Sequence, residues 1–344
     1  MNDIAVNPTP TQDSDRSFGA GRLQILFAAL LWSSSGFFAK APWFDGWPEE
    51  TRGLMLAFWR SFFACLVLVP LIRRPRFEWP LLPMTACFAL MVWSFMSAMV
   101  HGPAANAIWL QYLSPAWVLI AGVIWFRERV VRGDLIMFFF CLGGVALILA
   151  MELRSGVSLY PTAMALLSGV TFAGVVLSMR QMKDADPAWL ITLNHGATSL
   201  VLLPWVWNAE GAVPWTSYLA LGFFGVFQMS VPYVIFARGL RTTPSPEASV
   251  LALVEPILVP IWVWIAWSHH PSYDPPRWWT WLGASLILVG LLSRYLPVVY
   301  RSLWRSKSSL VEDAAGRDER SRGDSVRAVG APDIVSEAND VSAE

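Results

Sequence analysis

The chain has 344 residues, of which 55% are hydrophobic and 15% charged, and its mean hydropathy is +0.47. Soluble domains carry a lower hydrophobic and a higher charged share, so the lipid bilayer is the expected solvent. The formal net charge is zero, which gives neither a basic excess for nucleic acid nor an acidic excess for a cationic partner. The composition therefore predicts a membrane protein with no nucleic-acid partner.

The terminal segments differ from the rest of the chain. Residues 1–20 and 305–344 are polar and carry no apolar period, which predicts disordered tails. Arg16 and Arg22 precede an apolar run and resemble the start of a secretion signal. The run is long for such a signal, and the repeat described below needs it as a first helix, so we expect it to be retained.

Ten apolar runs lie between the tails, each close to the roughly 20 residues that a helix needs to cross the hydrocarbon. Connections between them are short, which leaves no room for a soluble catalytic domain. The runs cover residues 22–40, 53–72, 80–100, 104–126, 135–151, 157–179, 188–207, 213–237, 248–267 and 278–296.

Cysteine and tryptophan placement agrees with spanning helices. Cys65, Cys87 and Cys141 lie within apolar runs without CxxC or metal-ligand spacing, so they read as small hydrophobic residues, and we expect no disulfide framework, metal site or cofactor. The chain has 20 tryptophans, and several stand at the edges of runs, where aromatic belts meet the headgroups. These are Trp43, Trp47, Trp79, Trp189, Trp215, Trp267 and Trp278.

Orientation follows from the basic residues of the loops, which concentrate on the cytoplasmic side. An inside N-terminus places most arginines in inner loops, for example at 73–76, 127–132 and 238–241. The outer loops then hold few basic residues alongside several acidic ones. Ten spans with both termini in the cytoplasm, in the plasma or inner membrane, fit this pattern.

An internal match recurs at an offset of 141 residues. LQYLSP, from Leu110 to Pro115, lies over LALVEP, from Leu251 to Pro256. Each half therefore holds five spans, and because five is odd the second half crosses the membrane in the opposite direction. Inverted repeats recur in secondary transporters, where the halves exchange roles between inward-open and outward-open states.

The predicted fold is an all-α integral membrane protein of about ten transmembrane helices, built as two inverted five-helix repeats. Its expected parts are a tail at 1–20, repeats at 21–152 and 153–297, and a tail at 298–344.

Four segments carry a resemblance to a known family. They are ALLWSSSGFFAK (Ala29 to Lys40), FWRSFFACLVLVP (Phe58 to Pro70), ANAIWLQYLSPAWVLIAGVIWFRERV (Ala105 to Val130) and ASVLALVEPILVPIWVWIAW (Ala248 to Trp267). In this order the sequence resembles the EamA family of the drug/metabolite transporter superfamily. The resemblance implies export or exchange of small organic metabolites, amino acids or drugs. It departs from the family where His269 replaces the glutamate that would correspond to Glu128.

Two stripes of small and polar residues follow one helix face in each repeat. The 141-residue offset relates them, so they would face each other across a substrate cavity. Close packing through small residues explains the alanines, but not the glutamine and the glutamate. The stripes are Ala104, Ala107, Gln111, Ser114 and Val118, and Ser245, Ala248, Ala252, Glu255 and Val259.

Other candidate residues lie within the same spans. Arg60 is charged at depth, which suits a substrate carboxylate or a gate, whereas snorkelling or a structural pair is the alternative. Pro115 and Pro256 each remove an intrahelical hydrogen bond and are candidate hinges or plain kinks. Weaker candidates for lining the cavity are Trp32, Gln228 and Tyr233.

Glu255 is the titratable member of the stripes. It lies on the order of 12 Å from the cytoplasmic end of its span at 1.5 Å per residue, where its ionised form is disfavoured unless a cation approaches. We expect it either to contact a cationic group of the substrate or to exchange a proton, with Arg60 as its structural competitor. Ile148 is taken as a lipid-facing position for comparison.

Histidines are weaker candidates. His195, beside Asn194, reads more readily as hydrogen-bonded packing than as a titrating or binding residue. His269 and His270 lie in a loop with Asp274, but adjacent histidines rarely share one ion without a third ligand from elsewhere, so no metal site is predicted.

Three classes of function are compatible with the composition and the motifs. A secondary transporter of small organic solutes fits best. A membrane-embedded enzyme acting on lipid or peptide would need an HExxH, a GxSxG or paired acidic residues within a span, and the sequence has none of these. A sensor would need a soluble signalling domain. The sequence leaves the substrate, the coupling ion, proton coupling and a homodimer open.

Overall fold

The computed structural model describes residues 10–182, 184–271 and 273–300, and every regular element within them is helical. The first half contains α1 (Pro10–Trp32), α2 (Ser35–Ala39), α3 (Glu49–Leu68), α4 (Leu81–His101), α5 (Ala104–Gln111), α6 (Ser114–Phe126) and α7 (Arg132–Ser155). The second half contains α8 (Tyr160–Gln181), α9 (Pro187–Trp207), α10 (Trp215–Phe223), a π-helix (Phe224–Ser230), α11 (Val231–Gly239), α12 (Ser245–Ala252), α13 (Val254–Trp267) and a helix over Trp278–Tyr300.

The helices have the lengths that a bilayer requires. Nine helical segments of the described chain are long and apolar enough to cross a membrane. The expected tenth span is α9, which has 21 residues and packs against α3 and α4. Its apolar character is diluted by buried polar side chains such as Asn194 and His195. The prediction of an all-helical membrane protein with roughly ten spans is confirmed.

The first helix begins earlier than the sequence predicted. As described, α1 begins at Pro10, within the segment 1–20 that was expected as a tail, and residues 1–9 lie outside the described part. The limits of the tail stay a prediction. Pro10 stands at the first helical position, where its fixed φ and missing N–H are tolerated. At the other terminus the helix runs to Tyr300, and the rest of the expected tail is not described.

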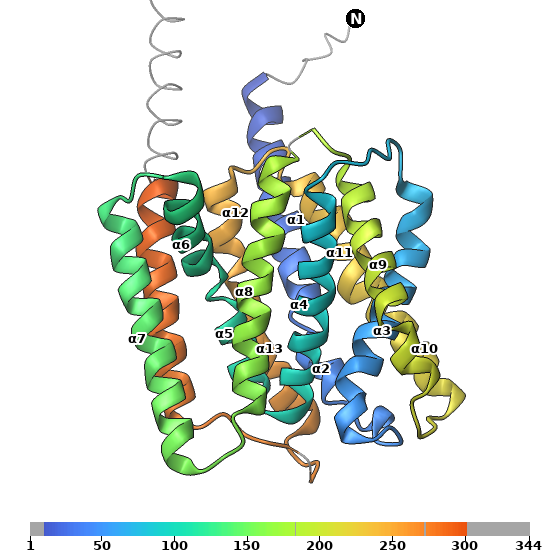
Figure 1. Cartoon of the computed structure of the whole chain (residues 1–344). Helices are drawn as coiled ribbons and strands as arrows, with labels where there is room; N and C mark the ends of the chain where they lie inside the picture. The colour runs from blue at the N-terminus through green and yellow to red at the C-terminus, as the bar shows by residue number, and fades with distance from the viewer. Residues whose placement is uncertain (1–9, 183, 272, 301–344) are drawn as a thin grey trace, which may run out of the picture. The chain divides into compact units, whose positions relative to one another are not determined.

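Four of the expected spans are interrupted. The span at 104–126 breaks between α5 and α6, and its repeat partner breaks at Leu253 between α12 and α13. The first span breaks after Trp32, and the span from α10 to α11 contains the π-helix. Figure 1 shows that α5 and α6 run in the direction opposite to α12 and α13, as inverted repeats require.

Helices of the two halves are interleaved. The helix pairs α4 and α8, α3 and α9, and α1 and α11 all join the first half to the second. Figure 1 also shows α7 side by side with the helix over Trp278–Tyr300. The core therefore lies between the repeats rather than within each one.

Ile148 is not a lipid-facing residue. Its side chain is fully buried, because α7 meets the last helix at Gly283, whose missing Cβ lets the Ile148 side chain approach. Both lipid and a neighbouring helix are apolar, so apolar character alone does not separate the two environments. Leu200, with 73% of its surface exposed, is a lipid-facing comparison position.

The basic loops lie at one end of the helices. Figure 1 places the connections after α3, α6, α8 and α11 at the end where α1 begins. The opposite end holds the connections before α3, α5, α8, α10 and the last helix. The arginine-rich loops predicted to share one side of the membrane therefore do share one end of the bundle.

Gly169 provides a test of the packing at the broken span. A Cβ on Gly169 of α8 would lie 2.8 Å from the carbonyl oxygen of Leu110, so Gly169→Val forces the helices apart. We expect a loss of about 1–3 kcal/mol in unfolding free energy, as for other overpacked sites. The thermal unfolding midpoint of the purified protein measures this loss.

The matched control for this substitution is Gly143→Val. Nothing lies within 4 Å of a Cβ at Gly143 on α7, so its midpoint should stay near that of the wild type. Equal midpoints for the two variants would contradict close packing of α8 on the break.

Candidate functional site

Arg60 lies at the centre of a buried polar group. It is on α3 with only 2% of its surface exposed, and its Nη1 donates a hydrogen bond of 3.4 Å to Oε1 of Gln228. Gln228 belongs to the π-helix, and its Nε2 donates to the Trp32 carbonyl oxygen at 3.1 Å. We define the central cluster by its residues, which are Trp32, Arg60, His195, Gln228 and Tyr233.

Local breaks in regular structure position this cluster. The Trp32 carbonyl is available because α1 ends at Trp32, and a π-helix turns Gln228 toward the bundle in a geometry that is common at functional sites. The Trp32 ring meets the Tyr233 ring edge to face, with centroids 5.1 Å apart. The centroid of the Tyr233 ring in turn lies 6.3 Å from that of the His195 ring. Helices of both repeats thus contribute to one cluster.

Arg60 has an aromatic neighbour rather than an acidic one. Its guanidinium carbon lies 5.2 Å from the centroid of the Phe224 ring, a geometry in which the ring quadrupole attracts the cation. No carboxylate oxygen of the described residues lies within 4.0 Å of it. Neither snorkelling nor a structural ion pair therefore describes Arg60, because its side chain is buried and its partner is neutral.

Several buried polar atoms of Arg60 and of α9 have no hydrogen-bond partner within the described part of the chain. They are Arg60 Nε, both ring nitrogens of His195 and Oδ1 of Asn194. Native proteins pair nearly all such groups, because burying an unpaired polar group is costly. This set of donors and acceptors can receive a polar solute, and a negative group on that solute would complement Arg60.

Glu255 lies at the break of span nine, the span formed by α12 and α13, and is held from the other repeat. Its Oε2 accepts a hydrogen bond of 2.8 Å from the hydroxyl of Tyr112. The same hydroxyl lies 3.2 Å from the Ala252 carbonyl oxygen, which is the group that loses its intrahelical donor because Pro256 has no N–H. Tyr112 itself follows the end of α5, at the break between α5 and α6 in span four. The two broken spans therefore meet through Tyr112.

Glu255 and Arg60 do not form the structural pair that was considered for them. They are close enough to interact electrostatically, yet Glu255 is bound by Tyr112 and Arg60 by Gln228. A carboxyl group and a guanidinium thus lie near each other without forming a direct ion pair. A solute with both a cationic and an anionic group would match this arrangement.

The other stripe residues lie at the break of span four. Gln111 ends α5 and Ser114 begins α6, and they are 8% and 6% exposed. Pro115 is the second residue of α6, so its missing N–H leaves the Gln111 carbonyl without its intrahelical donor. Neither Gln111 nor Ser114 has a side-chain hydrogen bond to the central cluster among the described residues. Their contact with a solute stays a prediction.

Sequence reasoning missed three residues of the site. Tyr112 lies within the repeated LQYLSP segment, but one position away from the stripe, and its counterpart is Leu253. His195 was interpreted as hydrogen-bonded packing, although neither ring nitrogen has a hydrogen-bond partner among the described residues. No sequence feature marked Phe224 as a site residue, because phenylalanine is common in apolar runs of this chain.

The loop histidines are directed to different partners. His270 Nε2 lies 3.8 Å from Asp45 Oδ2, and His269 Nδ1 lies 2.9 Å from Ser268 Oγ. No group of three or more metal-ligating side chains is found within the described residues.

An apolar pocket borders the central cluster. It has a volume of about 300 Å³ and is lined from α1, α2, the α10 to π-helix segment and α13. One of its lining residues, Phe38, stacks on Phe224 with ring centroids 4.7 Å apart. The Arg60 guanidinium lies over the Phe224 ring. The stacked rings therefore separate the apolar pocket from the guanidinium.

Membrane-crossing helices, broken at equivalent points of two inverted halves around buried polar groups, define a multi-pass membrane protein of the transporter class. The model of the EamA-like transporter family matches residues 19–150 and again residues 160–295. The chain therefore belongs to the EamA-like transporter family, and the resemblance seen in its sequence is confirmed.

Individual relatives agree with this class. The chain is 28% identical over 244 residues to an uncharacterized transporter of Archaeoglobus fulgidus, covering 69% of this chain and 84% of that protein. It is 25% identical over 190 residues to the pseudopaline exporter CntI of Pseudomonas aeruginosa, covering 54% and 65%. It is 26% identical over 296 residues to the uncharacterized inner membrane transporter YicL of Salmonella typhimurium, covering 79% of this chain and 94% of that protein.

A known crystal structure shares the fold. The match has a TM-score of 0.54 at 16% identity and covers 83% of this chain and 99% of the other.

Cysteine accessibility tests whether the breaks line an aqueous path. We expect cysteine at Gln111, Ser114 or Glu255, in a background without the three native cysteines, to react with small polar thiol reagents in membranes. Water must reach these positions during transport even though Gln111 and Ser114 are buried in the described state. Cysteine at the lipid-facing position Leu200 should not react. Protection of all three sites would favour simple helix packing.

Proposed function

We propose that this protein is a secondary transporter that moves small organic solutes across the cell membrane by alternating access. The observation that carries the proposal is the buried Arg60, whose guanidinium has no carboxylate within 4.0 Å in the described chain, together with Glu255 at a helix break nearby. A charge in such a position is costly unless it serves a ligand. The substrate we infer carries an anionic group for Arg60 and a cationic group for Glu255.

The inverted repeats support the alternating-access part of the proposal. Two halves of opposite direction can exchange conformations, which converts an inward-open state into an outward-open one around a fixed central site. Arg60 comes from the first half, and Gln228 and Glu255 come from the second. A relative motion of the halves would therefore change the access to the site without dismantling either half.

Several finer features belong to the same proposal. We infer repeat limits of 21–152 and 153–297, both termini in the cytoplasm, and location in the plasma or inner membrane. Proton exchange at Glu255 and a homodimeric assembly are parts of the prediction that need separate tests. The pseudopaline exporter among the relatives supports export as the direction.

A membrane-embedded enzyme is the competing proposal. It would require the purified protein to turn over a lipid or a peptide. Arg60, His195 and Glu255 are titratable and buried or part-buried in the same bundle, which is the one observation that favours this alternative. Turnover that depends on His195 would replace the transport proposal.

Substitution of the two charged residues tests the substrate class. In proteoliposomes loaded with radiolabelled zwitterionic amino acids, or with anionic or cationic analogues of similar size, we expect export of the zwitterions. Arg60→Gln should remove discrimination in favour of the carboxylate, and Glu255→Gln should lower transport or abolish its pH dependence. Loss of one charge-assisted hydrogen bond of about 1.5–3 kcal/mol corresponds to a fall of roughly 10- to 100-fold in affinity.

The control for these substitutions is Glu78→Gln, which removes a carboxyl from an exposed loop. It should transport like the wild type at every pH. Normal transport by Glu255→Gln across the same pH range would exclude a functional role for Glu255. Loss of folded protein in that variant would assign Glu255 to structure instead.

Reporter fusions test the orientation. Fusions after Arg76 and after Arg132 should report the cytoplasm, because these loops are rich in arginine. Fusions near Glu49 and Glu210 should report the outside. One reversed pair would remove the odd number of spans per half and contradict inverted repeats.

A further inference from the structure

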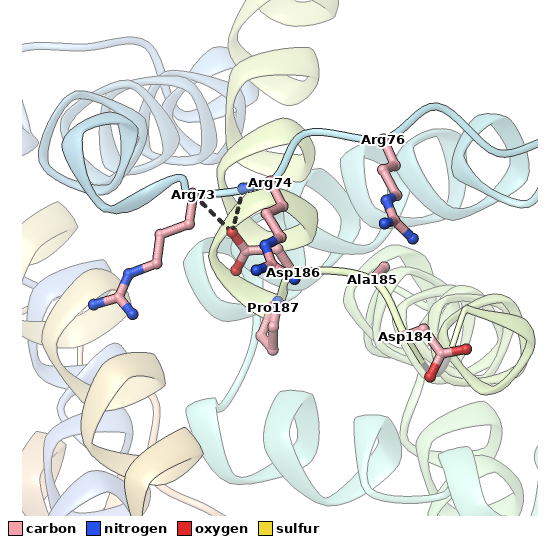
Figure 2. A pocket seen from close by; sticks show the side chains of 7 residues that line it. All are labelled: Arg73, Arg74, Arg76, Asp184, Ala185, Asp186 and Pro187. Atoms are coloured by element: carbon pink, nitrogen blue, oxygen red, sulfur yellow. Dashed lines mark hydrogen bonds between the residues drawn. The ribbon is translucent and has the colours of Figure 1, made fainter.

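A pocket of about 490 Å³ lies at the end of the bundle where α1 begins. It is formed by the loop between α3 and α4 and by the loop between α8 and α9, as Figure 2 shows. Its lining residues are Arg73, Arg74, Arg76, Asp184, Ala185, Asp186 and Pro187. The pocket lies at the ends of α3 and α9, the helices that carry Arg60 and His195, but no residue of the central cluster lines it.

Asp186 fixes the basic loop against α9. Its Oδ2 accepts hydrogen bonds from the backbone nitrogens of Arg73 and Arg74 at 2.8 and 3.1 Å, and its Oδ1 accepts one from Ala188 at 3.0 Å. Burial tends to raise the pKa of Asp186, but these backbone donors outweigh it and hold the pKa below its usual value. Asp186 therefore remains an anion whose charge is already bound by the backbone.

Trp189 provides the second attachment of this loop. Its Nε1 donates to the Arg76 carbonyl oxygen at 2.8 Å, and its ring meets the Phe77 ring edge to face, with centroids 5.4 Å apart. The loop backbone is thus held at both ends of the basic segment. The backbone positions that carry the three arginines are therefore fixed relative to α9.

Among the described residues, the three arginine side chains have no anionic partner. None of the three guanidinium groups takes part in an ion pair with a described residue, and all three residues are exposed. Asp184 is the remaining acidic group at the pocket, so the arginines exceed the carboxylates. Guanidinium groups match the geometry of phosphate oxygens particularly well.

The surroundings of the pocket indicate which phosphate it receives. Phe77 and Trp79 follow the arginines and are 82% and 83% exposed, as expected for aromatic residues at the level of the headgroups. Leu71, before them, is also exposed. These side chains place the pocket at the level of the headgroups, where lipid phosphates adjoin it, whereas a free phosphate ion would have to come from the solution.

We propose that this pocket binds the phosphate group of an anionic membrane lipid. Basic pockets between transmembrane helices on the cytoplasmic side are suited to such headgroups, and the pocket lies at the end that carries the other arginine-rich loops. The bound lipid would link the α3 to α4 loop to the start of α9. This inference does not depend on the transported substrate.

The test measures lipid binding by the purified full-length protein in a neutral detergent, with native mass spectrometry as the readout. We expect phosphatidylglycerol to bind more tightly than phosphatidylcholine. The triple variant Arg73→Gln, Arg74→Gln, Arg76→Gln should bind phosphatidylglycerol about 100-fold more weakly, from the usual contribution of three arginines near an anionic surface. Folding should survive, because the loop is attached through its backbone.

The matched control removes the same charge from another loop at the same end, through Arg127→Gln, Arg129→Gln and Arg132→Gln. It should keep the wild-type affinity. Equal loss in both triple variants, or no loss in either, overturns the proposal, because the attraction would then be diffuse or absent. If the first triple variant does not fold, each of its single substitutions must weaken binding about fivefold, and wild-type affinity in all three overturns it.

Inorganic phosphate separates a lipid from a free anion. At millimolar concentration it should leave the thermal unfolding midpoint unchanged, while phosphatidylglycerol raises it. An equal rise with inorganic phosphate would overturn the lipid assignment and identify the pocket as a site for soluble phosphate.

Discussion

A backbone carbonyl that loses its donor within a membrane helix must be satisfied by another group of the protein, because lipid offers none. In span nine that need arises at Ala252, since Pro256 supplies no N–H, and the Tyr112 hydroxyl of the other repeat lies 3.2 Å away. The same hydroxyl donates to Glu255. One side chain therefore stabilises the break, orients the carboxyl and joins the two halves, and the position of Glu255 relative to Arg60 depends on it.

The repeat is symmetric in its backbone but not in its chemistry. The offset that relates the two broken spans pairs Ser114 with Glu255 and Tyr112 with Leu253. At the first break Gly169 lets α8 approach the Leu110 and Gln111 carbonyl oxygens closely, whereas at the second break a tyrosine crosses from the other repeat. Each break is accommodated in its own way, and the titratable group occurs on one side only.

The sequence predicted the spans because each apolar run matches the bilayer thickness. It predicted interrupted helices near Pro115 and Pro256 because proline has no backbone N–H to donate. It could not identify which helix faces touch lipid, and Ile148 was misassigned for that reason. The partnership of Arg60 with Gln228 joins residues 168 positions apart. No local pattern indicates such a contact, and the π-helix that presents Gln228 has no distinct sequence period.

Glu247 and Asn106 occupy equivalent positions in the two repeats but make different contacts. Glu247 at the start of α12 pairs with Arg22 of α1, and Asn106, its counterpart at the offset of 141, donates to Glu152 at 2.6 Å. Thr162 of α8 also donates to Glu152. The Arg22–Glu247 pair thus joins α12 directly to α1. The Glu152 hydrogen bonds join α5 to α8 through α7. Arg22 is 40% exposed, so its pair contributes at most about 1 kcal/mol and weakens with salt, whereas the Glu152 hydrogen bonds are buried and screened little. Separating the helices at the two ends therefore has unequal costs, although the two halves share one backbone pattern.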